Sequence, residues 1–118
     1  DQGAAFIQTT NAILNSDAPN LVLPVAVGFV ARQLSLETRT VAALYLNAFA
    51  TALVLAGVRF IPLGQTEGQA VLQDLHPLIA EVAAFAVDAD VADIETSTFG
   101  ADLSAMGHET QEVRIFRT

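Results

Sequence analysis

Apolar side chains dominate residues 41–87 in two long runs, which are separated by a polar turn around residues 61–69. The first run, residues 41–58, is interrupted only by Asn47 and Thr51, which lie four positions apart and share one narrow stripe of a helix. We expect these two side chains to form hydrogen bonds between helices, because buried amides and hydroxyls must be satisfied. A helix that is apolar on nearly all sides is either the central helix of a bundle or a membrane span.

The positions of caps and prolines predict where each helix begins and ends. Ser35 is the expected N-cap of the central helix, and Pro62 is expected to end it. Thr66 and Gln69 fit a capping box that starts the next helix near Glu67. Pro77 is expected to divide that helix, because proline lacks the N–H of the helical ladder. The predicted helices are residues 4–14, 25–33, 36–59, 68–75, 78–87 and 99–105.

The fold class predicted from this pattern is all-α, a helical bundle with one central, nearly all-apolar helix and a C-terminal tail. We assign residues 1–105 to the bundle, as part of a larger domain, and residues 106–118 to the tail. A membrane protein is the rival class. Composition argues against it, because Asn47 lies near the middle of the run and single arginines, Arg39 and Arg59, flank both ends without the asymmetry that sets orientation.

Charge and composition narrow the function classes. The chain of 118 residues carries 13 acidic residues against 5 arginines and no lysine, a net charge of −8, which disfavours nucleic acid and anionic membrane surfaces. The absence of cysteine excludes disulfides, thiolate metal sites and a cysteine nucleophile, and it fits a cytoplasmic protein. Hydrophobic residues make up 53%, more than a small domain normally buries. We therefore expect neighbours from a further segment or from a second copy.

No motif predicts catalysis, a cofactor or a metal. His108, Glu109 and Glu112 form H-E-x-x-E, which has only one of the two histidines of a zinc-hydrolase helix. The glycines Gly64 and Gly68 flank a turn that lacks the lysine of a phosphate-binding loop. We therefore interpret the turn as structural first, with a contact surface as the alternative. Its residues are Pro62, Gly64, Gln65, Thr66, Gly68 and Gln69.

Two segments resemble a known family. The turn FIPLGQTEGQ at residues 60–69, preceded by Arg59, is similar to the R-x-x-P-L-G-Q-T-x-G-Q segment of the urease accessory protein UreF. The sequences MGHETQ at residues 106–111 and RIFRT at residues 114–118 resemble the end of that family's chain, M-R-H-E-T-Q-Y-x-R-L-F-R-S. The resemblance covers nearly all of this chain and corresponds to the second half of a UreF protein. Gly107 and Glu112 depart from the family's arginine and tyrosine.

The resemblance implies a non-enzymatic assembly factor in urease maturation. Its expected partners are UreD (also called UreH) and the GTPase UreG, which together deliver nickel into apo-urease, and it implies a homodimer. A generic helical homo-oligomerisation module is the alternative, and a membrane-helix protein is a weaker one. We expect partner binding to concentrate in the tail, with the fold-back of Phe116 onto the bundle as the alternative. The proposed partner-binding residues are Met106, His108, Glu109, Arg114, Phe116 and Arg117.

Overall fold

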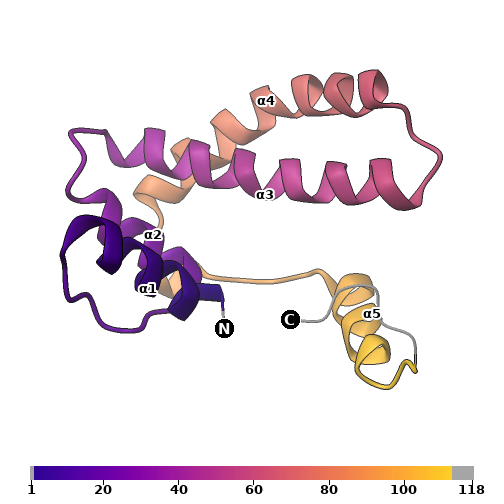
Figure 1. Cartoon of the computed structure of the whole chain (residues 1–118). Coiled ribbons are helices and arrows are strands. Elements are labelled where there is room, and N and C mark those ends of the chain that lie inside the picture. The colour runs from indigo at the N-terminus through magenta and orange to yellow at the C-terminus, as the bar shows by residue number, and fades with distance from the viewer. Residues whose placement is uncertain (1, 113–118) are drawn as a thin grey trace.

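The structure, a computed structural model, describes residues 2–112 and consists of helices joined by loops, without a strand in that part of the chain. Figure 1 shows a long hairpin of two helices, a shorter helix pair beside one end of it, and a separate helix near the C-terminus. The helices are α1 (Gln2–Leu14), α2 (Leu23–Ala31), α3 (Thr38–Phe60), α4 (Gln65–Asp88) and α5 (Phe99–Glu109), with a 3₁₀ turn η1 at Val91–Asp93. The prediction of an all-α fold is confirmed.

The hairpin of α3 and α4 is the main packing unit. Its turn spans residues 61–64, and Ile61 and Gly64 at the two ends of the turn adopt extended backbone conformations that end α3 and precede α4. Gly68 permits close approach, since a β-carbon at this position would lie 2.8 Å from Val58 Cγ2. The two apolar runs of the sequence thus pack directly against each other.

The start of α3 differs from the prediction. Glu37, with φ −64° and ψ 143°, is the N-cap residue, and the helix begins at Thr38. Ser35 is therefore two residues outside the cap position, and the prediction that it caps the helix is wrong. The N-cap position of α3 has no side-chain hydrogen bond, so packing rather than capping fixes where this helix starts.

The second apolar run is one helix rather than two. The α4 helix continues from Gln65 to Asp88 with Pro77 inside it, so the predicted division at this residue is wrong. The missing N–H of Pro77 removes one bond, to the carbonyl of Gln73, while the turns on both sides keep their ladders. Packing of Leu72 and Ala83, which are buried before and after the proline, holds the two halves in one helix.

The α1–α2 pair is held by polar and apolar contacts at its loop. Asn11 donates to the carbonyl of Ala18 at 3.0 Å and accepts from the backbone N–H of Ala18 at 2.9 Å. Gly3 lies against the backbone of residues 21–23 with no room for a side chain. Ile7 and Ala26 are buried where the helices meet. This pair contacts the hairpin through α2 and α3.

The described chain buries little of its apolar surface. Its buried apolar side chains are Ile7, Ala26, Leu72 and Ala83. The radius of gyration is 16.5 Å, whereas a compact domain of this length has about 13.5 Å. Among the helices that the structure describes, α5 packs against none of the others, and it follows an extended segment after α4 (Figure 1). The arrangement is open, and large apolar faces remain uncovered.

Candidate functional site

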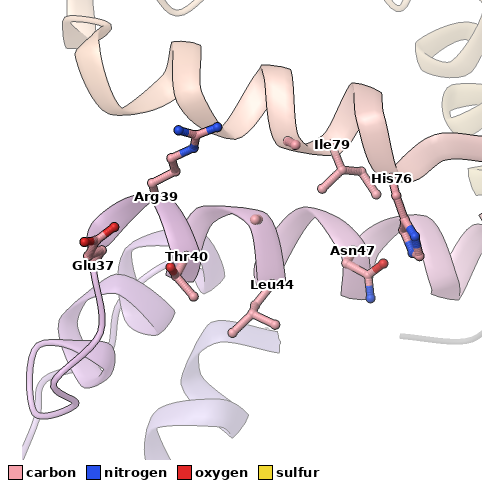
Figure 2. A pocket seen from close by; sticks show the side chains of 9 residues that line it. Glu37, Arg39, Thr40, Leu44, Asn47, His76 and Ile79 are labelled. Atoms are coloured by element: carbon pink, nitrogen blue, oxygen red, sulfur yellow. The ribbon is translucent and has the colours of Figure 1, made fainter. Parts of the chain in front are cut away.

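A cleft of about 530 Å³ lies along the hairpin between the start of α3 and the second half of α4. Figure 2 shows Arg39 extending from α3 towards α4, while Leu44 points away from α4. A second hollow of about 610 Å³ shares Asn47 and His76 with the first. Together they are lined by Glu37, Arg39, Thr40, Ala43, Leu44, Asn47, Thr51, Gln69, Leu72, Gln73, His76, Ile79 and Ala80.

The polar groups in this cleft do not form a reactive set. The Thr51 hydroxyl donates to the carbonyl of Asn47 in its own helix at 2.7 Å, so the prediction of a bond between helices is wrong for this residue. Within residues 2–112 no three metal-ligating side chains gather that could hold an ion. His76 therefore lines a mixed, open cleft that suits contact with another chain better than chemistry on a small molecule.

The turn before α4 is capped by a different residue than expected. Gly64 is the N-cap, and Glu67 Oε2 accepts the hydrogen bond of the Gly64 N–H at 2.8 Å. Thr66 already lies in the first turn of the helix, so the predicted capping box of Thr66 and Gln69 is wrong. The helix starts two residues before the predicted Glu67, because Gln65 already adopts helical geometry after the extended Gly64.

The proposed partner-binding residues fall into two groups. Met106, His108 and Glu109 lie on α5, which continues to Glu109 instead of ending at the predicted residue 105. His108 Nδ1 lies 3.2 Å from Gln111 Oε1, and Thr110 Oγ1 donates to the carbonyl of Gly107 at 3.1 Å. Arg114, Phe116 and Arg117 lie outside the described residues, so their predicted role stays a prediction.

The apolar face of α5 was missed from sequence. Phe99, Leu103 and Met106 have spacings of four and three residues, so they lie on one side of the helix. Their side chains are 74%, 68% and 68% exposed. The spacing was available in the sequence, but the predicted helix ended before Met106 and hid the pattern. A helix with such a face is a typical docking element for a groove in another chain.

Two helices are long and apolar enough to cross a membrane by length and composition alone. The most apolar 18 residues of α3 have a mean hydropathy of 2.0 and none of them is buried. The corresponding residues of α4 have a mean hydropathy of 1.4, and 11% of them are buried. The core helix of a soluble protein passes the same test, but such a helix is mostly buried, whereas α3 and α4 are mostly uncovered in the part of the chain that the structure describes. The α4 helix carries Asp74, Glu81 and His76 within its span, and such side chains are expensive inside a bilayer.

These features define a class before any comparison: a helical protein with uncovered apolar faces, an open cleft of mixed lining and no catalytic constellation in the part described. The UreF family model matches residues 1–76, which include the turn before α4. The chain belongs to the UreF family, and the resemblance seen in the sequence is confirmed.

Relatives named "Urease accessory protein UreF" align with all 118 residues. The protein of Cereibacter sphaeroides strain KD131 is 54% identical, and 56% of its own chain is covered. The proteins of Dinoroseobacter shibae and Jannaschia sp. are 52% and 48% identical, with 56% and 54% of their chains covered. The chain thus spans about half the length of the curated relatives it matches. No solved structure matches it.

The comparisons leave the position of this segment within the family chain as a prediction. The assignment to the second half of a UreF protein depends on the closing motif, which lies beyond the residues 1–76 that the family model covers.

Proposed function

We propose that this chain is the UreF-type scaffold of a urease maturation complex. In that complex it joins UreD and the GTPase UreG so that nickel is inserted into apo-urease. The observation that carries the proposal is the 54% identity to a urease accessory protein over all 118 residues. The role is that of a non-catalytic cytoplasmic protein, and a homodimer is the proposed assembly.

The C-terminal segment is the proposed docking element for UreD. Two observations support it: α5 packs against no other described helix, and its face of Phe99, Leu103 and Met106 is exposed. Arginine beside an aromatic residue is a frequent hot-spot composition, and the sequence that follows α5 supplies Arg114, Phe116 and Arg117. The proposed interface therefore combines an apolar helix face with a basic, aromatic tail.

Co-purification with UreD and UreG tests the role directly. We expect the chain to retain both partners, and we expect removal of residues 99–118 to abolish UreD binding while the remaining helices keep their circular dichroism signal. A chain that binds neither partner and only associates with itself would establish the generic oligomerisation module instead.

Point variants locate the interface. Met106→Ala, and separately alanine at Arg114, Phe116 and Arg117 together, should each weaken UreD binding by at least about tenfold, as hot-spot residues do. The matched control is Ile13→Ala, since Ile13 is also an apolar helical side chain and is 73% exposed, but lies at the end of α1. Undiminished UreD binding by both variants would show that the C-terminal segment does not form the UreD interface. A clear fall in the melting temperature of the variant with alanine at Arg114, Phe116 and Arg117 would support instead the fold-back of Phe116 onto the helices.

A further inference from the structure

The outer side of α4 carries a second apolar stripe that no described helix covers. Its residues alternate in spacings of four and three, the repeat of a helix that packs along another helix. Four of them are between 40% and 71% exposed, and Leu75 is half-buried. We define this stripe as the α4 seam, and its residues are Val71, Leu75, Leu78, Val82 and Phe85.

The α4 seam is distinct from the side of α4 that packs on α3. Leu72 is 7% exposed and Ile79 is half-buried. Each follows directly after a seam residue, Leu72 after Val71 and Ile79 after Leu78. In heptad terms Leu75 and Val82 occupy position a, Leu78 and Phe85 position d, and Leu72 and Ile79 position e. Position e is therefore used by the hairpin, whereas position d is open. Position a is open at Val82, half-buried at Leu75 and buried against α3 at Gly68.

Acidic side chains lie along the edge of the seam that is opposite to Leu72 and Ile79. They recur every seven residues, at the g position of each heptad, and all are exposed: Glu67, Asp74, Glu81 and Asp88. Charges at this position contact the facing helix and select it by sign. In the described part of the chain no basic side chain pairs with Asp74, Glu81 or Asp88. A fitting helix would therefore be apolar along one face and carry Arg or Lys beside that face.

A second copy of α4 is a poor occupant of its own seam. In an antiparallel pair the g positions of the two helices face each other, which brings carboxylates together. In a parallel pair they face position e, where Leu72 and Ile79 already pack on α3 and offer no positive charge. The chain as a whole contains five arginines and no lysine, so it has few basic residues to offer.

The uncovered area is larger than one protein contact normally buries. The chain exposes 9441 Å², whereas a compact protein of 12.4 kDa exposes about 6,100 Å². The excess of roughly 3,300 Å² exceeds the roughly 2,500 Å² on one side of a large obligate interface. It is also spread over different sides of the chain, including α5, the α4 seam and the stripe of Phe49, Leu53 and Phe60 on α3.

We infer that the α4 seam receives a helix from the remaining part of a full-length UreF-type chain. The 118 residues are 56% of the Cereibacter sphaeroides relative, whose chain is therefore longer by about 90 residues, enough for several helices. The covering helix is apolar on one face and flanked by Arg or Lys. With it in place, α3 and α4 form the interior of a larger helical domain.

The test uses a full-length chimera in which these 118 residues replace the matching part of the Cereibacter sphaeroides relative. The 118 residues contain no cysteine, so with serine in place of any cysteine in the relative's part, a single introduced cysteine reports accessibility through its rate of maleimide labelling. Phe85→Cys should be labelled at least about tenfold more slowly in the chimera than in the 118-residue chain. The matched control Ala70→Cys, on the exposed polar side of the same helix, should be labelled equally fast in both.

Three outcomes would overturn the inference. Fast labelling of Phe85→Cys in the chimera would show that the seam stays open. Protection that disappears on dilution, or a disulfide between two copies through this cysteine, would assign the seam to a second copy. Recovery of the chimera in the membrane fraction, with protection that requires lipid, would assign it to a bilayer.

A charge reversal tests the chemistry of the covering helix. Glu81→Lys should lower the melting temperature of the chimera but leave that of the 118-residue chain unchanged, because the facing basic residues exist only in the chimera. The control Asp17→Lys, at an exposed position in the α1–α2 loop, should leave both unchanged. An unchanged melting temperature of the chimera carrying Glu81→Lys would contradict the expectation that Arg or Lys flanks the apolar face of the covering helix. Both measurements are independent of UreD and UreG, so failure here and failure of the proposed scaffold role are distinguishable.

Discussion

Gly68 and Gly57 are both helical glycines, yet a β-carbon would meet different surroundings at each. At Gly68 it would lie 2.8 Å from Val58 Cγ2 and 3.3 Å from Val54 Cγ1, both on the facing helix. At Gly57, within α3, nothing lies within 4 Å. The first glycine is required by the close approach of α3 and α4, and the second is not required by any neighbour.

This contrast gives a paired prediction. Gly68→Ala should destabilise the chain by about 1 kcal/mol, because overpacking at the valines outweighs the gain in helix propensity. Gly57→Ala should stabilise it by about 0.5–1 kcal/mol through that propensity alone. Urea unfolding followed by circular dichroism measures both. If both variants changed the free energy of unfolding equally and in the same direction, the close packing at Gly68 would be contradicted.

Glu67 is the second residue whose role depends on geometry. Its carboxylate accepts the N–H of Gly64 and also lies at the positive end of α4. Glu67→Ala should therefore lower the free energy of unfolding by about 0.5–1 kcal/mol, whereas Thr66→Ala should change it by less than about 0.5 kcal/mol. The measurement is again urea unfolding, with Glu67→Gln as a control that keeps an acceptor and removes the charge. A larger effect from Thr66→Ala would restore threonine as the cap.

At the scale of the element, α4 combines a proline with an uninterrupted helix. Pro77 lies between the buried residues Leu72 and Ala83, so contacts with α3 on both sides of the proline hold the helix together. A proline inside a helix costs about 3 kcal/mol relative to alanine, and here that penalty is offset by packing rather than avoided.

Pro77→Ala should accordingly stabilise the chain by about 1–3 kcal/mol, since it restores the N–H and removes the clash with the preceding turn. Pro62→Ala is the matched control. Pro62 lies in the turn outside the helices, so its replacement should destabilise by about 0.4–1 kcal/mol through the freer unfolded chain. If Pro77→Ala were destabilising, a bend at this residue would be necessary for packing.

At the scale of the whole molecule, the exposed apolar area decides how the chain behaves alone. A surface this far above that of a compact protein favours association. We expect light scattering at micromolar concentration to show the 118-residue chain as a dimer or larger species. Leu78→Glu should not convert it to a monomer, because the acidic edge of the seam disfavours self-pairing there. A well-folded monomer of the 118-residue chain would contradict the expected association. A monomer produced by Leu78→Glu would show that the seam is the self-association surface.

The sequence by itself determined the all-α class, the hairpin around the turn at residues 61–69 and the family. These follow from local signals: apolar runs of helical length, a proline and glycine turn, and motif residues in order. The sequence also contains the spacings of four and three residues that define the exposed apolar faces of α4 and α5. Local patterns carry such information because the helical period alone fixes which side chains share a face.

Only the tertiary structure decided which local signals prevail. Ser35 and Thr66 are good capping residues, yet the caps are Glu37 and Gly64, because packing of the hairpin sets where the helices start. Pro77 breaks helices in isolation, but contacts with α3 on both sides of it keep α4 whole. The seam on α4 became recognisable once α3 was seen to cover the edge formed by Leu72 and Ile79, which leaves Val71, Leu78, Val82 and Phe85 exposed. In each case long-range burial, worth several kcal/mol over a helix, exceeds a local preference of about 1–3 kcal/mol.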